Sequence, residues 1–230
     1  MINFSKRSYQ KELLDAEGIS MNDTMQTMKE LDIINTYLGG HAITLNGFKK
    51  LLGNKKQTSI CEIGCGGGDN LNVIGKWCKK NGVKIKLIGV DINLNCSNVI
   101  ERTNSEIEFL GSDYKKIDFD KNVPNILFSS LFCHHFTDEE LIEMVLWMKT
   151  NSTRGFFIND LHRHPLAYHS IKLITKLFSS SHLVKNDGPL SVLRSFKKTD
   201  WINILQQAGI TNYTIQWKWA FRYLIVVYND

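Results

Sequence analysis

The stretch TSICEIGCGGGD, residues 58–69, decides the fold class of this chain. Its first six residues predict a short buried strand that runs directly into glycines. Glycines let the backbone approach a ligand closely and take positive φ angles. A helix is expected at about 69–80, and its first turn offers free N–H groups beside the glycines. The stretch therefore predicts a ligand site beyond the carboxyl end of a strand in an open α/β sheet.

The rest of the chain alternates strand and helix patterns. Further strands are expected at 84–90, 107–110, 125–129 and 155–159, with helices at about 93–103, 138–149 and 198–208 between or after them. Such alternation predicts a parallel sheet with right-handed crossovers. The last two strands, 212–217 and 220–228, are joined too tightly for a crossover helix and predict an antiparallel hairpin. The fold class is therefore α/β, with a seven-stranded, mostly parallel, Rossmann-like sheet.

Two segments lie outside this alternation. Residues 1–53 predict an N-terminal helical lid, with one helix capped by Asn22 or Asp23 and another at about 41–52. Residues 54–230 form the main domain, and 161–195 interrupt it. This insertion should hold an amphipathic helix at about 165–179 and then a loop at 187–189. It is expected to fold over the site as a second lid, although an interface with another subunit explains its apolar residues nearly as well.

Acidic residues follow three successive strands. Glu62 stands two residues before the first glycine, where it would repel a pyrophosphate and favour a cationic ligand. Asp91 ends the second strand, where it can accept hydrogen bonds from ribose hydroxyls, and Asp113 follows the third, within reach of an adenine amino group. Either aspartate alone could be a helix cap, but the three together favour a nucleoside site. The dinucleotide spacing fails, because Asp69 stands where its third glycine belongs.

This pattern resembles the class I S-adenosylmethionine-dependent methyltransferases over about residues 55–228. The resemblance implies that S-adenosylmethionine is the cofactor, that the glycine turn lines its methionine end and that Asp91 holds its ribose. Ile92, Asp113 and Tyr114 would lie around the adenine, and the residues after the fourth strand would face the sulfonium. The implied cofactor residues are Glu62, Gly64, Cys65, Gly66, Gly68, Asp91, Ile92, Asp113, Tyr114, Ser130 and Leu131.

Three further segments are similar to bacterial small-molecule methyltransferases of the quinone and polyketide pathway type. They are residues 31–40, residues 159–168 and residues 187–192. The similarity implies an apolar, aromatic or polyketide-like methyl acceptor. Nucleic-acid amino-methyltransferases tend to carry an Asn- or Asp-Pro-Pro-aromatic tetrapeptide after the fourth strand, and residues 128–136 (FSSLFCHHF) lack it.

Histidines and an aspartate near the strand ends are the candidate catalytic residues. His134 or His135 could act as the general base if the acceptor is a hydroxyl or an acidic carbon, whereas a carboxylate acceptor needs none. Both could instead only pack or shape the pocket. Asp160 is a third catalytic candidate, or else caps a turn. The expected substrate-binding residues are His135, His162, His164 and Tyr168. No metal is expected, because Pro165 and the mixed spacing of the nearby histidines do not suit a metal-binding helix face.

Composition limits the other functions. The net charge is +5, carried by scattered lysine doublets without a basic stripe, so no nucleic-acid partner is expected. Five cysteines without a paired pattern predict free thiols in a reducing, cytoplasmic compartment, and no apolar run is long enough to span a membrane. A monomer or homodimer is expected. The alternatives left open are an RNA or protein methyltransferase, a noncatalytic S-adenosylmethionine-binding protein and, least favoured, a nicotinamide-dependent oxidoreductase.

Overall fold

A seven-stranded sheet forms the centre of the protein, with the strand order β3-β2-β1-β4-β5-β7-β6. The computed structural model describes residues 2–16, 18–119 and 122–229. The strands are β1 (Gln57–Ile63), β2 (Lys84–Asp91), β3 (Ile107–Gly111), β4 (Ile126–Ser130), β5 (Gly155–Leu161), β6 (Tyr213–Lys218) and β7 (Arg222–Tyr228). β1 to β5 run parallel, while β7 lies between β5 and β6 and is antiparallel to both. The predicted sheet and its terminal hairpin are confirmed.

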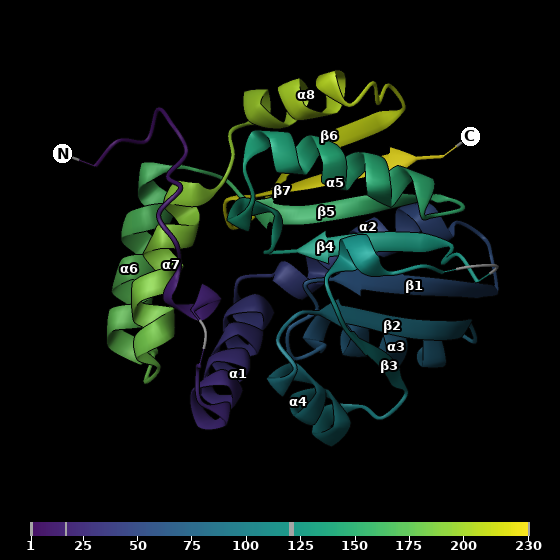
Figure 1. Ribbon diagram of the computed structural model, residues 1–230, viewed down its shortest axis with the longest axis horizontal. Helices are drawn as coiled ribbons and strands as arrows, with labels where there is room; N and C mark the ends of the chain where they lie inside the picture. The colour runs from purple at the N-terminus through teal and green to yellow at the C-terminus, as the bar shows by residue number, and fades with distance from the viewer. Residues whose placement is uncertain (1, 17, 120–121, 230) are drawn as a thin grey trace.

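Helices cover both faces of the sheet (Figure 1). They are α1 (Met21–Tyr37), α2 (Gly40–Leu52), α3 (Asp69–Lys80), α4 (Asn95–Thr103), α5 (Asp138–Thr150), α6 (Pro165–Phe178), α7 (His182–Arg194) and α8 (Lys198–Gln207). Three short 3-10 helices are η1 (Leu13–Asp15), η2 (Tyr114–Lys116) and η3 (Cys133–His135). α5 and α8 bury their apolar sides on one face, and α2, α3 and α4 on the other.

The alternation of side chains along β5 builds both cores. Phe156 and Ile158 point to the α5 and α8 face, and Phe157 points to the α2 face. The ring of Phe157 stacks on Phe128 of β4 with centroids 4.8 Å apart. A Cβ at Gly47 would lie 2.5 Å from the Phe157 ring, so this glycine lets α2 press closely against the sheet. α2 is therefore part of a sheet-covering layer, although the sequence placed it within a lid. The division of the chain at residue 53 stays a prediction.

α1, α6 and α7 gather at one end of the sheet, beyond the carboxyl ends of the parallel strands (Figure 1). We call residues 7–16, which run along this group before α1, the N-terminal strap. The Ser8 N–H donates to the Leu193 carbonyl at 3.0 Å, and Arg7 Nε donates to the Arg194 carbonyl at 2.8 Å. The strap therefore docks on the end of α7.

Two local predictions were wrong. Ser20, not Asn22 or Asp23, caps α1: its hydroxyl accepts a hydrogen bond from the Asp23 N–H. The expected loop at 187–189 is part of α7, with Pro189 inside the helix. Asp-Gly-Pro is a strong local turn signal, but α7 buries several apolar side chains, and this packing overrides local preference. These buried side chains are Leu183, Val184, Leu190 and Val192.

All five cysteines are free and buried, in agreement with the expectation of free thiols. Within the described ranges, none of the helices combines the length and apolar character needed to cross a bilayer.

Candidate active site

The carboxyl ends of β1, β2 and β4 and the turn after β3 surround a cavity of about 1060 Å³. We call it the cofactor cavity. Of the eleven residues predicted to bind a cofactor, Gly68 alone does not line it. Gly68 instead precedes α3 with φ of 72°, and a Cβ there would lie 3.1 Å from the Ile100 side chain. The other ten therefore lie around one cavity, and their contact with a cofactor stays a prediction.

The glycine turn is a tight cradle at the floor of this cavity. Gly64 and Gly66 have φ angles of 69° and 49°, which favour glycine. A Cβ at Gly64 would also lie 2.4 Å from the Phe132 ring, so both backbone conformation and space require glycine there. The Gly64 and Cys65 N–H groups donate to the Val90 carbonyl, which ties the turn to the end of β2.

Glu62 is a buried carboxyl at one end of the cofactor cavity. Its Oε1 accepts a hydrogen bond from Asn70 Nδ2 at 3.0 Å, while its Oε2 has no hydrogen-bond partner among the described residues. Burial raises the pKa of Glu62 well above its usual range, and the nearby charge of Asp69 adds to this. An orphaned buried carboxyl oxygen gains most from a cationic ligand group.

His41 supports this end of the cavity. Its Nδ1 lies 3.1 Å from Asn70 Oδ1, and its Nε2 lies 2.9 Å from Asp32 Oδ1 and 3.6 Å from Asp69 Oδ2. Because Asn70 donates its amide group to Glu62, its Oδ1 must accept from His41. Both ring nitrogens of His41 therefore face oxygen atoms of neighbouring side chains, and this holds Asn70 in place beside Glu62.

Asp91 and Asp113 also line the cavity. Asp91 Oδ1 accepts from the Asn93 N–H and its Oδ2 from the Gly66 N–H, both at 2.9 Å. Burial raises the pKa of Asp91. Asp113 caps η2 by accepting from the Lys115 N–H at 3.0 Å. Each oxygen keeps a lone pair for further donors, so these contacts are compatible with binding hydroxyl or amino groups.

The apolar positions of the cavity differ in exposure. Ile92 is 74% exposed and Leu94 is 65% exposed, and both line the cavity, so they are open to cover a flat ring. The Tyr114 side chain is buried, and its ring packs edge-on against Phe136 and Trp147. Tyr114 therefore belongs mainly to the core, with a smaller part in the cavity than expected.

A second cavity of about 340 Å³ adjoins the first, and we call it the apolar cavity. Its walls come from α1, α6, α7 and the loop before β7, and most of its lining residues are apolar. Four residues line both cavities: Leu14, Leu31, Leu131 and His135. Leu131 has a φ of 54°, which is unusual for a leucine and fixes its position immediately after β4.

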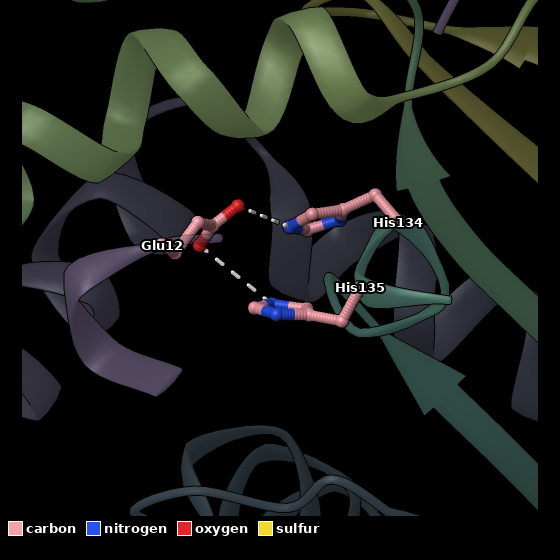
Figure 2. A group of neighbouring side chains, drawn as sticks. All are labelled: Glu12, His134 and His135. Carbon is pink, nitrogen blue, oxygen red and sulfur yellow. Dashed lines mark ion pairs between the residues drawn. The ribbon is translucent and has the colours of Figure 1, made fainter. Parts of the chain in front are cut away.

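Two histidines and a glutamate meet where the cavities adjoin (Figure 2). Figure 2 shows both imidazoles pointing from η3 towards Glu12 of the strap. The Nε2 atoms of His134 and His135 lie 3.5 and 3.7 Å from the Glu12 carboxylate oxygens. On the opposite side of the rings, His134 Nδ1 lies 2.8 Å from Asp160 Oδ1, and His135 Nδ1 lies 2.9 Å from Asp15 Oδ1. Carboxylates therefore flank both nitrogens of each ring.

This arrangement changes the acidity of its members. Burial alone would lower the pKa of His134, but Asp160 and Glu12 outweigh it and raise the pKa to about 10. Burial alone would likewise raise the pKa values of Glu12 and Asp160, but the histidines hold both below their usual range. His134 is therefore an imidazolium at neutral pH, between two carboxylates.

The same three residues offer ligand atoms within 4.8 Å of one another, which is close enough to hold a metal ion. One feature opposes this use: Arg194 Nε lies 3.6 Å from Glu12 Oε1, where it would repel a metal cation. We therefore interpret the cluster as a network of ion pairs.

Comparisons with known proteins agree with this geometry. Residues 61–146 match a family model described as a methyltransferase domain. Human N-acetylserotonin methyltransferase, solved with S-adenosylmethionine, has the same fold with a TM-score of 0.63 and 17% identity. The match covers 92% of this chain and 57% of the human one, so the chain spans little more than half of that protein.

The chain has the fold of the class I S-adenosylmethionine-dependent methyltransferases, and residues 61–146 carry the match to a methyltransferase domain. The plantazolicin methyltransferase BpumL, solved with S-adenosylhomocysteine, has a TM-score of 0.65 and 16% identity over 91% of this chain and 89% of its own. Magnesium protoporphyrin IX methyltransferase from Synechocystis, also solved with S-adenosylhomocysteine, has a TM-score of 0.56 and 15% identity over 90% and 97%. No curated protein sequence matches significantly. The predicted fold is confirmed, and the domain match and the ligands of these structures are consistent with the predicted family and cofactor.

The residues around the cofactor cavity fit S-adenosylmethionine. The cofactor carries an ammonium and a sulfonium, for which the orphaned Glu62 oxygen is a suitable partner. Asp91 and Asp113 offer acceptors for its ribose and adenine, and Gly64 and Gly66 leave room that a Cβ would fill. These residue roles remain predictions.

The remaining predicted substrate residues lie elsewhere. His162, His164 and Tyr168 line neither cavity. His162 Nδ1 accepts from the exposed Trp217 Nε1 at 3.3 Å, and burial lowers the pKa of His162 to about 4. His164 stacks on Phe221 and caps α6, and Tyr168 packs against Phe4. In these positions the three residues pack against neighbouring side chains or cap a helix.

Sequence reasoning missed several residues of the site. Glu12 and Asp15 lie in a segment without helical or strand periodicity, and no motif marks them. Arg194 donates from Nη2 to the His135 carbonyl at 2.9 Å and from Nε to the His134 carbonyl at 3.1 Å, so it fixes the histidine turn. Phe132, which packs over Gly64, could have been inferred from its place directly after the fourth strand.

Proposed function

We propose that the protein transfers the methyl group of S-adenosylmethionine to a weakly acidic hydroxyl, or to a carbon activated by one, of an apolar small molecule. The observation that carries this proposal is the position of His135, which lines both the cofactor cavity and the apolar cavity. A methyl donor in the first cavity and an acceptor in the second would meet beside this side chain.

The apolar cavity suits a small acceptor. Small-molecule sites are typically about 300–1,000 Å³ and mostly apolar, with a few polar groups that fix orientation. This cavity, of about 340 Å³, has walls such as Leu38, Ile171 and Ile174, with the histidine pair and Glu12 at the junction with the cofactor cavity. A nucleic acid could reach this apolar cavity only with a flipped base, and a folded protein only with an extended side chain.

Proton transfer distinguishes the acceptor groups. The cofactor supplies an electrophilic methyl group on a sulfonium. A phenol has a pKa near 10 and gains from a general base that takes its proton as the carbon–oxygen bond forms. We assign that role to His135. Glu12 and Asp15 lie beside its two nitrogens and stabilise the positive charge that it acquires.

His134 and Asp160 have a supporting role in this proposal. His134 holds its proton between Asp160 and Glu12, so it is a fixed cation whose ring centroid lies 4.6 Å from that of His135. This fixed positive charge stabilises an acceptor oxygen that becomes negative as its proton leaves.

Carboxylate acceptors fit less well. They are already ionised at neutral pH and need no base, and three carboxylates (Glu12, Asp15 and Asp160) surround the histidine pair. Of the substrate contacts expected from the sequence, the proposal keeps His135 and omits His162, His164 and Tyr168. The cofactor contacts remain as expected, with the smaller part for Tyr114 and Gly68 described above.

The test is a turnover screen with labelled S-adenosylmethionine against phenols, enolisable ketones, carboxylates, amines and RNA. We expect turnover with phenols or enols, and NMR of the product identifies the methylated atom. His135→Gln should lower kcat by roughly 10²–10⁴-fold, while His182→Gln, an exposed histidine on α7, should leave it unchanged. Turnover confined to carboxylates or RNA, or tight cofactor binding without turnover on any class, would refute the proposal.

A further inference from the structure

The N-terminal strap delivers two carboxylates to the histidine pair. Glu12 and Asp15 both come from this segment, whereas the histidines follow β4 and Asp160 belongs to β5. Leu14, between the two carboxylates, lines both cavities. The strap therefore closes the site and supplies two of its carboxylates. This requires a contact that fixes the position of the strap relative to the histidine pair.

Asp187 of α7 makes the contact that sets this register. Its Oδ1 accepts a hydrogen bond from the Leu13 N–H and its Oδ2 from the Leu14 N–H, each at 2.9 Å. These are first-turn N–H groups of η1, which have no partner within the helix. Asp187 is only 7% exposed, and Asn186 Nδ2 donates to its Oδ1 at 2.8 Å. Hydrogen bonds to a buried carboxylate are among the strong ones.

One face of α7 continues this contact. Asp187, Ser191 and Arg194 follow each other at spacings of four and three residues, which places them on one side of a helix. Ser191 Oγ donates to Glu12 Oε1 at 2.9 Å. Arg194 donates from Nη1 to the Gln10 carbonyl and from Nη2 to the His135 carbonyl. This face therefore connects the strap to the histidine turn.

We propose that Asp187 is a positioning residue for methyl transfer, which holds the strap so that Glu12 and Asp15 lie beside the histidine pair. Asp187 touches neither histidine, so it acts through the strap. The proposal rests on the function proposed above, in which His135 takes the acceptor's proton. Packing alone would not require a charged side chain at position 187, and the proposal gives the carboxylate a role.

The test compares Asp187→Ala and Asp187→Asn with Glu101→Gln, an exposed carboxylate on α4. We expect Asp187→Ala to lower kcat about 10–100-fold and Asp187→Asn less, because an amide still accepts one of the two hydrogen bonds. Cofactor affinity, measured with S-adenosylhomocysteine, should change much less than kcat. Glu101→Gln should behave as wild type in both measurements.

Two readouts separate positioning from general destabilisation. In the double variant Asp187→Ala/Glu12→Gln, the losses should not multiply, because both changes remove the same strap carboxylate from the site. The alkaline limb of the kcat–pH profile should move to lower pH in Asp187→Ala. The charged or titratable groups in contact with His134 are Asp160 of β5, Glu12 and Arg7 of the strap, His135 of η3 and Arg194 of α7. Of these, Glu12 is the group that should move away from His134 in this variant.

Multiplicative losses, or an equal loss of activity at every pH, would overturn the proposal. A third measurement does not depend on turnover. Hydrogen exchange of the Leu13 and Leu14 amides should accelerate in Asp187→Ala, and His134 should titrate at lower pH in NMR spectra. If wild type methylates no acceptor, the proposed function fails; if both amides and His134 are also unchanged in the variant, the role of Asp187 fails separately.

Discussion

Replacing Asp160 with asparagine tests the central ion pair of the site. The side chain is fully buried, and its Oδ1 lies 2.8 Å from His134 Nδ1. Oδ1 also accepts from the Leu161 N–H at 2.7 Å. The asparagine side chain would keep the shape and one acceptor oxygen but lose the negative charge and the acceptor for the His134 backbone N–H, whose nitrogen lies 3.3 Å from Oδ2. The substitution therefore removes mainly the electrostatic part of the contact.

The size of the effect follows from the acidity of His134. Its pKa lies at about 10 rather than at 6.5, a difference that corresponds to roughly 5 kcal/mol of preference for the charged ring in the folded protein. Asp160 and Glu12 share this contribution, and Asp160 is the stronger of the two. We therefore expect Asp160→Asn to lower the free energy of unfolding by about 2–4 kcal/mol near pH 6, in the range for broken buried pairs.

The raised pKa of His134 also predicts how the stability difference changes with pH. A pKa that is raised on folding contributes its full stability below about pH 6.5, and the contribution is lost as the pH rises towards 10. The difference in stability between wild type and Asp160→Asn should therefore be largest near pH 6 and should shrink steadily towards pH 10. Taking the difference cancels the titration of buried cysteines and tyrosines, which is common to both proteins.

Urea unfolding between pH 6 and pH 10 measures this difference. Glu143→Gln is the matched control, because it removes a carboxylate from an exposed ion pair with Lys115 at 2.7 Å. That variant should lose less than about 1 kcal/mol, without the same pH trend. A stability difference for Asp160→Asn that stays constant with pH, or that matches the control, would refute the assignment of His134 as a cation held by Asp160.

Three further predictions concern the cavities. Asp91→Ala should weaken S-adenosylhomocysteine binding by about 1–3 kcal/mol through lost charge-assisted hydrogen bonds; unchanged calorimetric affinity in a folded variant would contradict the role of Asp91. Because the pKa of Glu62 is raised, binding of the ligand's ammonium should release a proton, so affinity should rise with pH. Calorimetry in two buffers should show this release, and Glu62→Gln should abolish it. Ile174 lines only the apolar cavity, so Ile174→Trp should raise the acceptor KM and leave cofactor affinity unchanged; equal effects on both would count against the division of the cavities.

The parts of the site that the sequence predicted are those that depend on local signals. Glycines at 64–68 and acids at the ends of β1 and β2 mark the cofactor cavity, because parallel strands bring their carboxyl ends to one edge. The hairpin at the end of the sheet follows from a connection too short for a helix. These features needed only periodicity and the chemistry of single residue types.

The rest depends on contacts between distant segments. Nothing in residues 7–16 distinguishes Glu12 from a solvated surface glutamate, and its role emerges only when the strap meets α7 and η3. The turn signal at 187–189 gave the wrong local structure, and so it hid the face of α7 that holds Asp187. His162 and His164 looked equivalent to His134 and His135 by their place after a strand, but the chain after β5 carries them away from both cavities.

The family match covers the two cavities unequally. Residues 61–146 include Glu62, Asp91 and Asp113, and thus the carboxylates of the cofactor cavity. The apolar cavity draws mainly on α1, α6 and α7, which lie outside that range. A common cofactor constrains the first set of residues, whereas each acceptor makes its own demands on the second. His134 and His135 stand inside the matched range, but the charges that set their behaviour come from Glu12, Asp15 and Asp160 outside it. Under the proposed function, the segments that fold onto the shared domain would set the acceptor chemistry, and changes in them should alter the acceptor while the cofactor site stays intact.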